Sequence, residues 1–139
     1  MSQPALAVKL LILGGVANLV LSFALGWLLS QHRMRGPMPP HHWLLVAHTV
    51  SLQEGVMLLG LAFAALFARL PDAAAVAAAA LLVAASLFQD LSGIVNWRRG
   101  TGDQFAERSA GWKLASINAV LNSVGLVILV GGVVRGLLA

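Results

Sequence analysis

Hydrophobic residues gather into four long runs along this chain, and short polar segments separate the runs. The runs cover about residues 5–29, 43–68, 73–97 and 112–138. Each run can cross a bilayer as a helix, which takes roughly 20 predominantly apolar residues. Only a short turn joins the second and third runs, so we expect these two helices to be antiparallel neighbours. The pattern predicts an all-α, polytopic membrane protein: a single domain, residues 1–139, built as an antiparallel bundle of four transmembrane helices.

Composition excludes a soluble domain, because only 10% of the residues are charged and 59% are hydrophobic, whereas soluble domains carry about 25% charged residues. The absence of cysteine excludes disulfides, thiolate metal sites and a cysteine nucleophile. A formal charge of +4 is compatible with nucleic-acid binding, but the basic residues lie mainly in the first and third loops, which favours membrane orientation. We therefore expect an integral protein of a bacterial cell membrane, with these two loops in the cytoplasm and no nucleic-acid partner.

The second hydrophobic run contains His48, Gln53 and Glu54 at positions where lipid would favour leucine. Ionisable groups at such depth are costly and usually mark a functional site. His48 and Gly55 are seven residues apart and share one helix face, so we expect Gly55 to leave room beside the histidine. Glu54 points about 120° away from His48, toward a neighbouring helix.

The other three runs also place small or polar residues near the first and third loops. From the helical rise of about 1.5 Å per residue, these residues and Glu54 lie within roughly 16 Å of that end of the bundle. The opposite half consists of alanine, leucine and valine. We therefore predict a polar cavity that opens toward the first and third loops. The residues that point to it are Ser22 and Gly26 in the first run, Asp90 and Asn96 in the third, and Asn118 and Asn122 in the fourth.

The candidate side chains allow both chemical and purely structural roles. His48 could ligate haem or a metal ion, or move a proton; the alternative is an interhelical hydrogen bond. Glu54 and Asp90, if they are close together, would share a proton, and the alternative is pairing with Gln53, Gln89 or the asparagines. The sequence contains no serine-nucleophile pattern and no H-E-x-x-H zinc motif.

The first loop, expected from Ser30 to His42, offers a separate group of histidines. His32, His41 and His42 could bind a metal ion. Adjacent histidines cannot share a helix face, however, and no carboxylate is nearby. A hydrated loop at the membrane surface is therefore the better interpretation.

Several short motifs resemble those of the small four-span membrane isomerases that include hydroxylaminobenzene mutase and styrene oxide isomerase. The matching residues are Arg33-Met34, Ala47-His48, Glu54-Gly55-Val56-Met57 and Asn96-Trp97. The resemblance implies a homotrimer that binds haem b through His48 and rearranges a small aromatic substrate without net oxidation or reduction. By the same resemblance, Glu54 faces the substrate pocket and Asn96 matches a third-helix asparagine. With Asp90, which lies at a similar depth, these are the candidate catalytic residues, and Gly55, on the face of His48, is assigned to the cofactor site.

Two departures separate this chain from the two enzymes it resembles. The mutases have a histidine two residues before the glutamate, where this chain has Leu52, and His48 lies one helical turn earlier. The epoxide isomerases use a tyrosine, and this chain has none. Conversion of a hydroxylaminoarene into a 2-aminophenol is the favoured reaction, with aryl epoxide isomerisation as the alternative. A non-catalytic assembly or carrier protein, or a proton-coupled transporter, would explain the polar residues without such chemistry.

Overall fold

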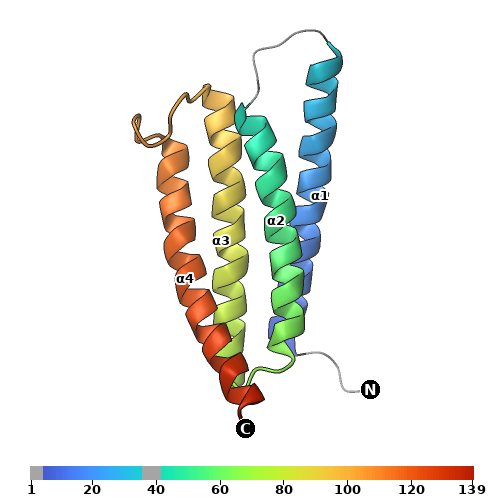
Figure 1. The fold of residues 1–139 in the computed structure, drawn as a ribbon, viewed down its shortest axis with the longest axis vertical. Coiled ribbons are helices and arrows are strands. Elements are labelled where there is room, and N and C mark those ends of the chain that lie inside the picture. The colour runs from blue at the N-terminus through green and yellow to red at the C-terminus, as the bar shows by residue number, and fades with distance from the viewer. Residues whose placement is uncertain (1–4, 36–41) are drawn as a thin grey trace.

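The computed structural model describes residues 5–35 and 42–139, and the described part of the chain is all-helical. Its four helices run alternately up and down, so the start of the first helix and the end of the fourth lie at the same end of the bundle (Figure 1). All four helices are long and apolar enough to cross a membrane. The predicted fold class, a membrane-spanning four-helix bundle, is thereby confirmed. The helices are α1 (Leu6–Met34), α2 (His42–Ala65), α3 (Asp72–Arg99) and α4 (Ala110–Leu137).

Two helix ends differ from the sequence prediction. Helix α1 continues to Met34, so residues 30–34, which we assigned to the first loop, are helical. Helix α2 ends at Ala65 rather than near residue 68, because successive i→i+3 bonds tighten the chain there. The backbone N–H of Arg69 then donates to the carbonyl oxygen of Gly132 on α4, which fixes the turn against the bundle.

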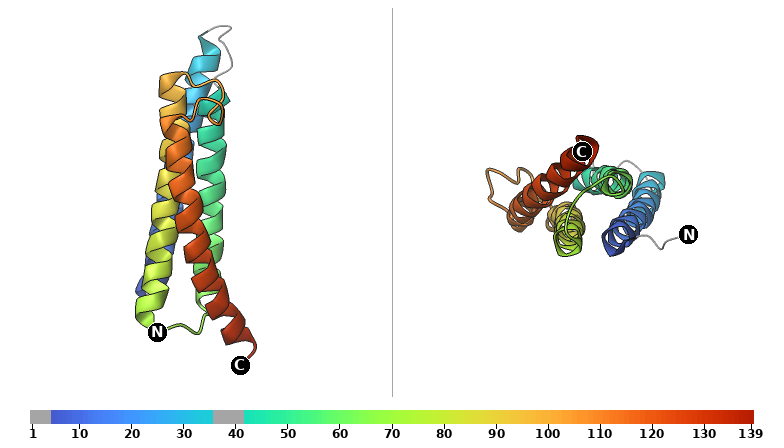
Figure 2. Two further views of the ribbon diagram at one scale, coloured as in Figure 1. Left: turned by 90° about the vertical axis from the view of Figure 1, so that its left-hand side faces the viewer. Right: turned by 90° about the horizontal axis from the view of Figure 1, so that it is seen from below.

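The bundle consists of two tightly packed helix pairs, α1 with α2 and α3 with α4. Helices α2 and α3 join the pairs, and α1 also packs on α3. Helix α4 barely touches α2, and it does not contact α1 in the described part of the chain. Seen from the end, α1 and α4 lie on opposite flanks (Figure 2). Helix α4 therefore packs almost only on α3, and much of its surface is free to face lipid or another protein.

Small residues allow the paired helices to approach closely. Gly15 on α1 and Gly55 on α2 face each other, and a Cβ added at either would lie 3.0 Å from the other residue's carbonyl oxygen. Helix α4 repeats this device every seven residues on the side that meets α3 or the turn before it. Such small-residue contacts drive association where lipid removes the hydrophobic force between helices. The residues of the α4 row are Gly111, Asn118, Gly125 and Gly132.

The core is apolar at the end with the chain termini and polar nearer the loops, as the sequence predicts. Leucine, alanine and valine side chains from all four helices form the apolar cluster. Toward the loops the buried side chains include asparagine, serine and aspartate. The buried polar residues on the helices are Asn18, Ser22, Ser51, Ser86, Asp90, Ser92 and Asn96.

Candidate functional site

His48 lies on the side of α2 that packs against α1, where Ser22 holds its ring. The Nδ1 atom of His48 lies 2.8 Å from the backbone oxygen of Ser22. The Ser22 hydroxyl donates to the backbone oxygen of His48 at 3.0 Å and also lies 3.2 Å from Nδ1. Two neighbouring helices are thereby joined at the histidine, so the imidazole has a defined position and orientation.

These contacts decide which ring nitrogen of His48 is free. A carbonyl oxygen only accepts hydrogen bonds, so Nδ1 carries the proton and donates to Ser22. In this tautomer Nε2 presents a lone pair, and it has no hydrogen-bond partner among the described residues. Histidines that ligate metals usually have this arrangement, with the second nitrogen donating to a carbonyl or carboxylate.

Gly26 provides the space that the imidazole occupies. A Cβ added at Gly26 would lie 2.9 Å from Cε1 and 3.1 Å from Nδ1 of His48. Beside this contact lies an open groove of about 330 Å³ on the outer surface of α1 and α2. The rings of Phe23 and Trp27 form much of its wall, and these side chains are 77% and 64% exposed. The His48 groove, lined by Phe23, Gly26, Trp27, Ser30 and His48, combines a free nitrogen ligand with a flat apolar surface.

Gly55 does not have the position that we expected. It shares a helix face with His48, but its space is filled by Leu19 and by the backbone of Gly15. The expectation of open room at Gly55 beside the histidine is therefore wrong for the single chain. The glycine that lies against the ring is Gly26, on the neighbouring helix.

Glu54 on α2 lies beside Asp90 on α3, on the side of α2 that packs against α3. The Ser51 hydroxyl donates to Oδ1 of Asp90 at 2.6 Å, while Oδ2 is buried without a partner among the described residues. Glu54 is half-buried, its Oε2 also lacks a partner, and its carboxyl interacts electrostatically with that of Asp90. The two predicted acids are therefore neighbours, but neither lines the His48 groove.

Buried oxygens without hydrogen-bond donors recur in this half of the protein. Asn118 donates to Oε1 of Gln89 at 2.8 Å, and Asn18 donates to Ser86 at 3.0 Å. In each asparagine the amide oxygen stays unpaired. Every buried side-chain N or O atom found without a partner in the described residues is an acceptor oxygen: Asn18 Oδ1, Glu54 Oε2, Asp90 Oδ2, Asn118 Oδ1 and Asn122 Oδ1.

Asn96 is fully buried under the loop that joins α3 to α4. Its Nδ2 donates to Oε1 of Gln104 at 3.0 Å, and its Oδ1 accepts from the hydroxyl of Ser109 at 2.7 Å. A side chain on Gly111 would collide with the Asn96 amide. These bonds give Asn96 a clear structural part in holding the loop, and its assignment to catalysis stays a prediction.

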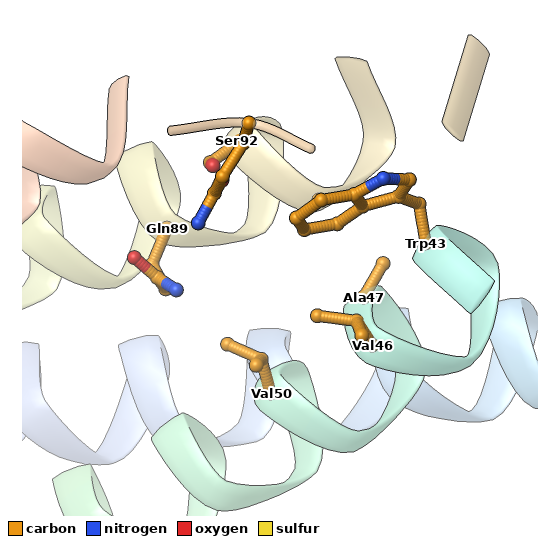
Figure 3. Close-up of a pocket in the computed structure, with 8 residues that line it drawn as sticks. Trp43, Val46, Ala47, Val50, Gln89 and Ser92 are labelled. Atoms are coloured by element: carbon orange, nitrogen blue, oxygen red, sulfur yellow. The ribbon is translucent and has the colours of Figure 1, made fainter. Parts of the chain in front are cut away.

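The predicted cavity near the loops exists, but it is small and has different walls. It holds about 60 Å³ and lies between α2, α3 and the loop at residues 100–109 (Figure 3). His48, Glu54 and Asp90 do not line it. One common cavity for all the polar groups is therefore wrong for the single chain, because α2 separates the histidine from the acids. The loop cavity is lined by Trp43, Val46, Ala47, Val50, Gln89, Ser92, Gly93 and Gln104.

The histidines of the first loop are placed only in part. His32 lies on α1, where its ring meets Trp97 edge-on, and His42 begins α2. His41 lies outside the described residues. Within the described ranges, no group of three or more histidine, aspartate or glutamate side chains is arranged to hold a metal ion.

Sequence analysis missed the partners that fix the candidate residues. Ser22 and Gly26 were assigned to the polar cavity, but the sequence gives no signal that they meet His48. Ser51, which bonds Asp90, and Gln104, which bonds Asn96, were not singled out at all. The four-residue spacing of Ser51 from Gly55 was the available signal, since it places the serine on the inward face of α2.

Together the fold and these clusters define a membrane protein with an outward-facing histidine groove and an acidic interior. Comparison with known proteins adds no closer assignment: no family profile, curated protein or solved structure matches this chain.

Proposed function

We propose that this protein is a membrane-embedded haem b isomerase that rearranges a hydroxylaminoarene into a 2-aminophenol. The observation that carries the proposal is the tautomer of His48, whose Nδ1 donates to the Ser22 carbonyl while Nε2 stays free beside an apolar groove. A histidine that served only to join two helices would not need a free nitrogen next to two exposed aromatic rings. The motif resemblance supports the same chemistry.

The residues of the His48 groove fit a haem. His48 would ligate the haem iron, and Phe23 and Trp27 would pack against the porphyrin and exclude water. Ser22 keeps the imidazole in the ligating tautomer, and Gly26 leaves the ring unobstructed. When bound, haem iron supplies Lewis acidity toward a substrate oxygen.

The reaction itself needs proton transfer but no external oxidant or reductant. The N–O bond breaks, a C–O bond forms at the ortho carbon, and the proton lost from that carbon is balanced by one gained at nitrogen. A carboxyl group is suited to hold and return this proton. Glu54 and Asp90 are the candidates, because they are adjacent carboxyl groups with unpaired buried oxygens.

Since α2 separates these acids from His48 within one chain, we propose that the site is completed between copies in a homo-oligomer. The His48 groove opens outward on the surface of α1 and α2, and Glu54 lies with Asp90 on the side of α2 that packs against α3. A head-to-tail contact would bring the groove of one copy to the acidic side of the next. Contacts of this kind close into rings, and the trimer implied by the resemblance is one such ring.

The excess of unpaired acceptor oxygens favours the mutase reaction over epoxide isomerisation. A hydroxylaminoarene carries N–H and O–H donors that could satisfy such oxygens, whereas an epoxide only accepts hydrogen bonds. Unsatisfied polar groups are costly where the bilayer provides no water. The interhelical bonds also suit the rival proposal, a non-catalytic assembly protein, in which Asn18–Ser86 and Ser51–Asp90 serve only to join helices.

The test is a spectrum and a turnover assay on protein purified in detergent from haem-sufficient cells. We expect a Soret band, conversion of phenylhydroxylamine into 2-aminophenol, and loss of both in His48→Ala. His42→Ala is the matched control, because His42 is exposed at the start of the same helix. Colourless protein without turnover would refute the proposal, and a Soret band that His48→Ala leaves unchanged would refute the ligand assignment.

A further inference from the structure

The loop cavity is more enclosed than the open His48 groove, and the two share no lining residue. Figure 3 shows Trp43, Val46, Ala47 and Val50 on the α2 side of it, with Gln89 and Ser92 on α3 opposite. Gln104, from the connecting loop, completes the wall. Polar and apolar atoms contribute about equally to this wall, so the hydrogen-bonding state of the polar atoms decides what the cavity can hold.

Two carboxamide groups present hydrogen-bond donors without acceptors in this cavity. The Oε1 atom of Gln89 is occupied by Asn118, and the Oε1 atom of Gln104 is occupied by Asn96. This leaves the two Nε2 groups, which have no partners among the described residues. The hydroxyl of Ser92 already donates to the backbone oxygen of Gly111. Up to four N–H bonds are therefore free at a wall that offers little competing acceptor capacity.

Charge near the cavity favours an anion as the acceptor. The segment 98–113 carries four basic residues against two acidic ones. Both acids are engaged by backbone N–H groups of the loop, Asp103 by those of Phe105 and Ala106, and Glu107 by those of Gly102 and Asp103. The first turn of α2 also borders the cavity, and the partial positive charge of a helix N-terminus stabilises anions nearby.

We propose that the loop cavity is a binding site for a small oxyanion of the carboxylate class. A volume of 60 Å³ corresponds to about four water molecules. Formate or acetate matches this size, whereas an aromatic carboxylate does not. The carboxylate oxygens accept from Nε2 of Gln89 and Nε2 of Gln104, and the side chains of Val46 and Val50 contact the apolar remainder.

The test measures thermal unfolding of the full chain in detergent as sodium formate replaces sodium chloride at constant ionic strength. We expect a saturable rise in Tm for the unmodified protein, because a ligand that binds only the folded state stabilises it. Sodium benzoate should produce no saturable rise. Gln104→Glu keeps an oxygen that can accept from Asn96 but replaces the donor by a negative charge, and it should raise the Kd for formate by about tenfold or more.

Two further variants separate loss of binding from loss of folding. Gln31→Glu makes the same chemical change at the loop end of α1, outside the cavity, and should keep the formate response. Val46→Leu fills the cavity without changing a polar group and should lose the response. Equal Tm shifts in Gln104→Glu, Val46→Leu and the unmodified protein would show that formate acts elsewhere. The absence of a saturable Tm shift in the unmodified protein would show that the cavity holds only water. Either of these two results would overturn the proposed carboxylate site.

Discussion

Replacing Gly26 by alanine would test the packing that orients His48. The added Cβ would lie 2.9 Å from Cε1 and 3.1 Å from Nδ1, closer than ordinary van der Waals contact. The ring cannot move without disturbing the 2.8 Å bond from Nδ1 to the Ser22 carbonyl. Inserting a methyl group into such a contact costs about 1–3 kcal/mol.

The same substitution also stabilises the helix, because alanine has a higher helix propensity than glycine. A second variant measures this gain alone. Alanine is better than glycine in a helix by about 1 kcal/mol. A Cβ at Gly60 on α2 would meet no atom within 4 Å, so Gly60→Ala should show only this gain. The difference in unfolding free energy between Gly26→Ala and Gly60→Ala should therefore equal the contact cost, about 1–3 kcal/mol.

The assay is reversible unfolding in mixed micelles, followed by circular dichroism, together with the absorption spectrum. Gly26→Ala should unfold more easily than Gly60→Ala and, if haem is bound as proposed, should shift or weaken the Soret band. Equal stabilisation of both variants would refute the close contact between Gly26 and His48. If Gly26→Ala lowers the unfolding free energy relative to Gly60→Ala but leaves the Soret band unchanged, the close contact is supported and His48 is refuted as the haem ligand.

Three further predictions concern the other polar clusters. Ser51→Ala removes the donor from Asp90 and should lower the unfolding free energy by about 0.6–1.7 kcal/mol, the range for hydrogen bonds between membrane helices; no change would mean that the bond contributes nothing. Asn96→Ala should free the loop that it holds, measured as faster trypsin cleavage there, and an unchanged rate would contradict its structural part. In co-expressed His48→Ala and Glu54→Gln chains, random mixing should restore about a quarter of the turnover, because that share of interfaces has both residues intact. Turnover as low as in each variant alone would place the two groups in one subunit.

The hydropathy pattern predicted the number, order and direction of the helices, because the bilayer imposes the same length on each span. The hydropathy pattern predicted the ends of the helices less well. Residues 30–34 are too polar to suggest a membrane span, yet they continue α1, since a helix does not have to stop at the membrane surface. The end of α2 depends on the bond from Arg69 to Gly132, which joins residues far apart in the sequence.

The candidate site was predicted residue by residue but not as an arrangement. Periodicity places His48 and Gly55 on one face of α2, and the structure agrees. It cannot tell which neighbour fills each position, because that depends on how α1 is rotated and shifted against α2. Gly26 thus took the place that we gave to Gly55. Depth alone likewise could not separate His48 from Asp90, because His48 on α2 faces α1 whereas Asp90 on α3 meets the opposite side of α2.

A single copy of this chain does not enclose a reaction site. The His48 groove is open on the outside of α1 and α2, and the two acids, Glu54 on α2 and Asp90 on α3, lie together between those two helices. In lipid, a buried polar atom without a partner is costly, and contacts with another group relieve this cost where water cannot. Glu54 has such an atom, and the His48 groove offers an aromatic surface of the kind that a neighbouring subunit or a flat cofactor covers. Because the two features lie on different sides of the molecule, each copy can supply one to the next, and the proposed ring would form as many complete sites as it has subunits.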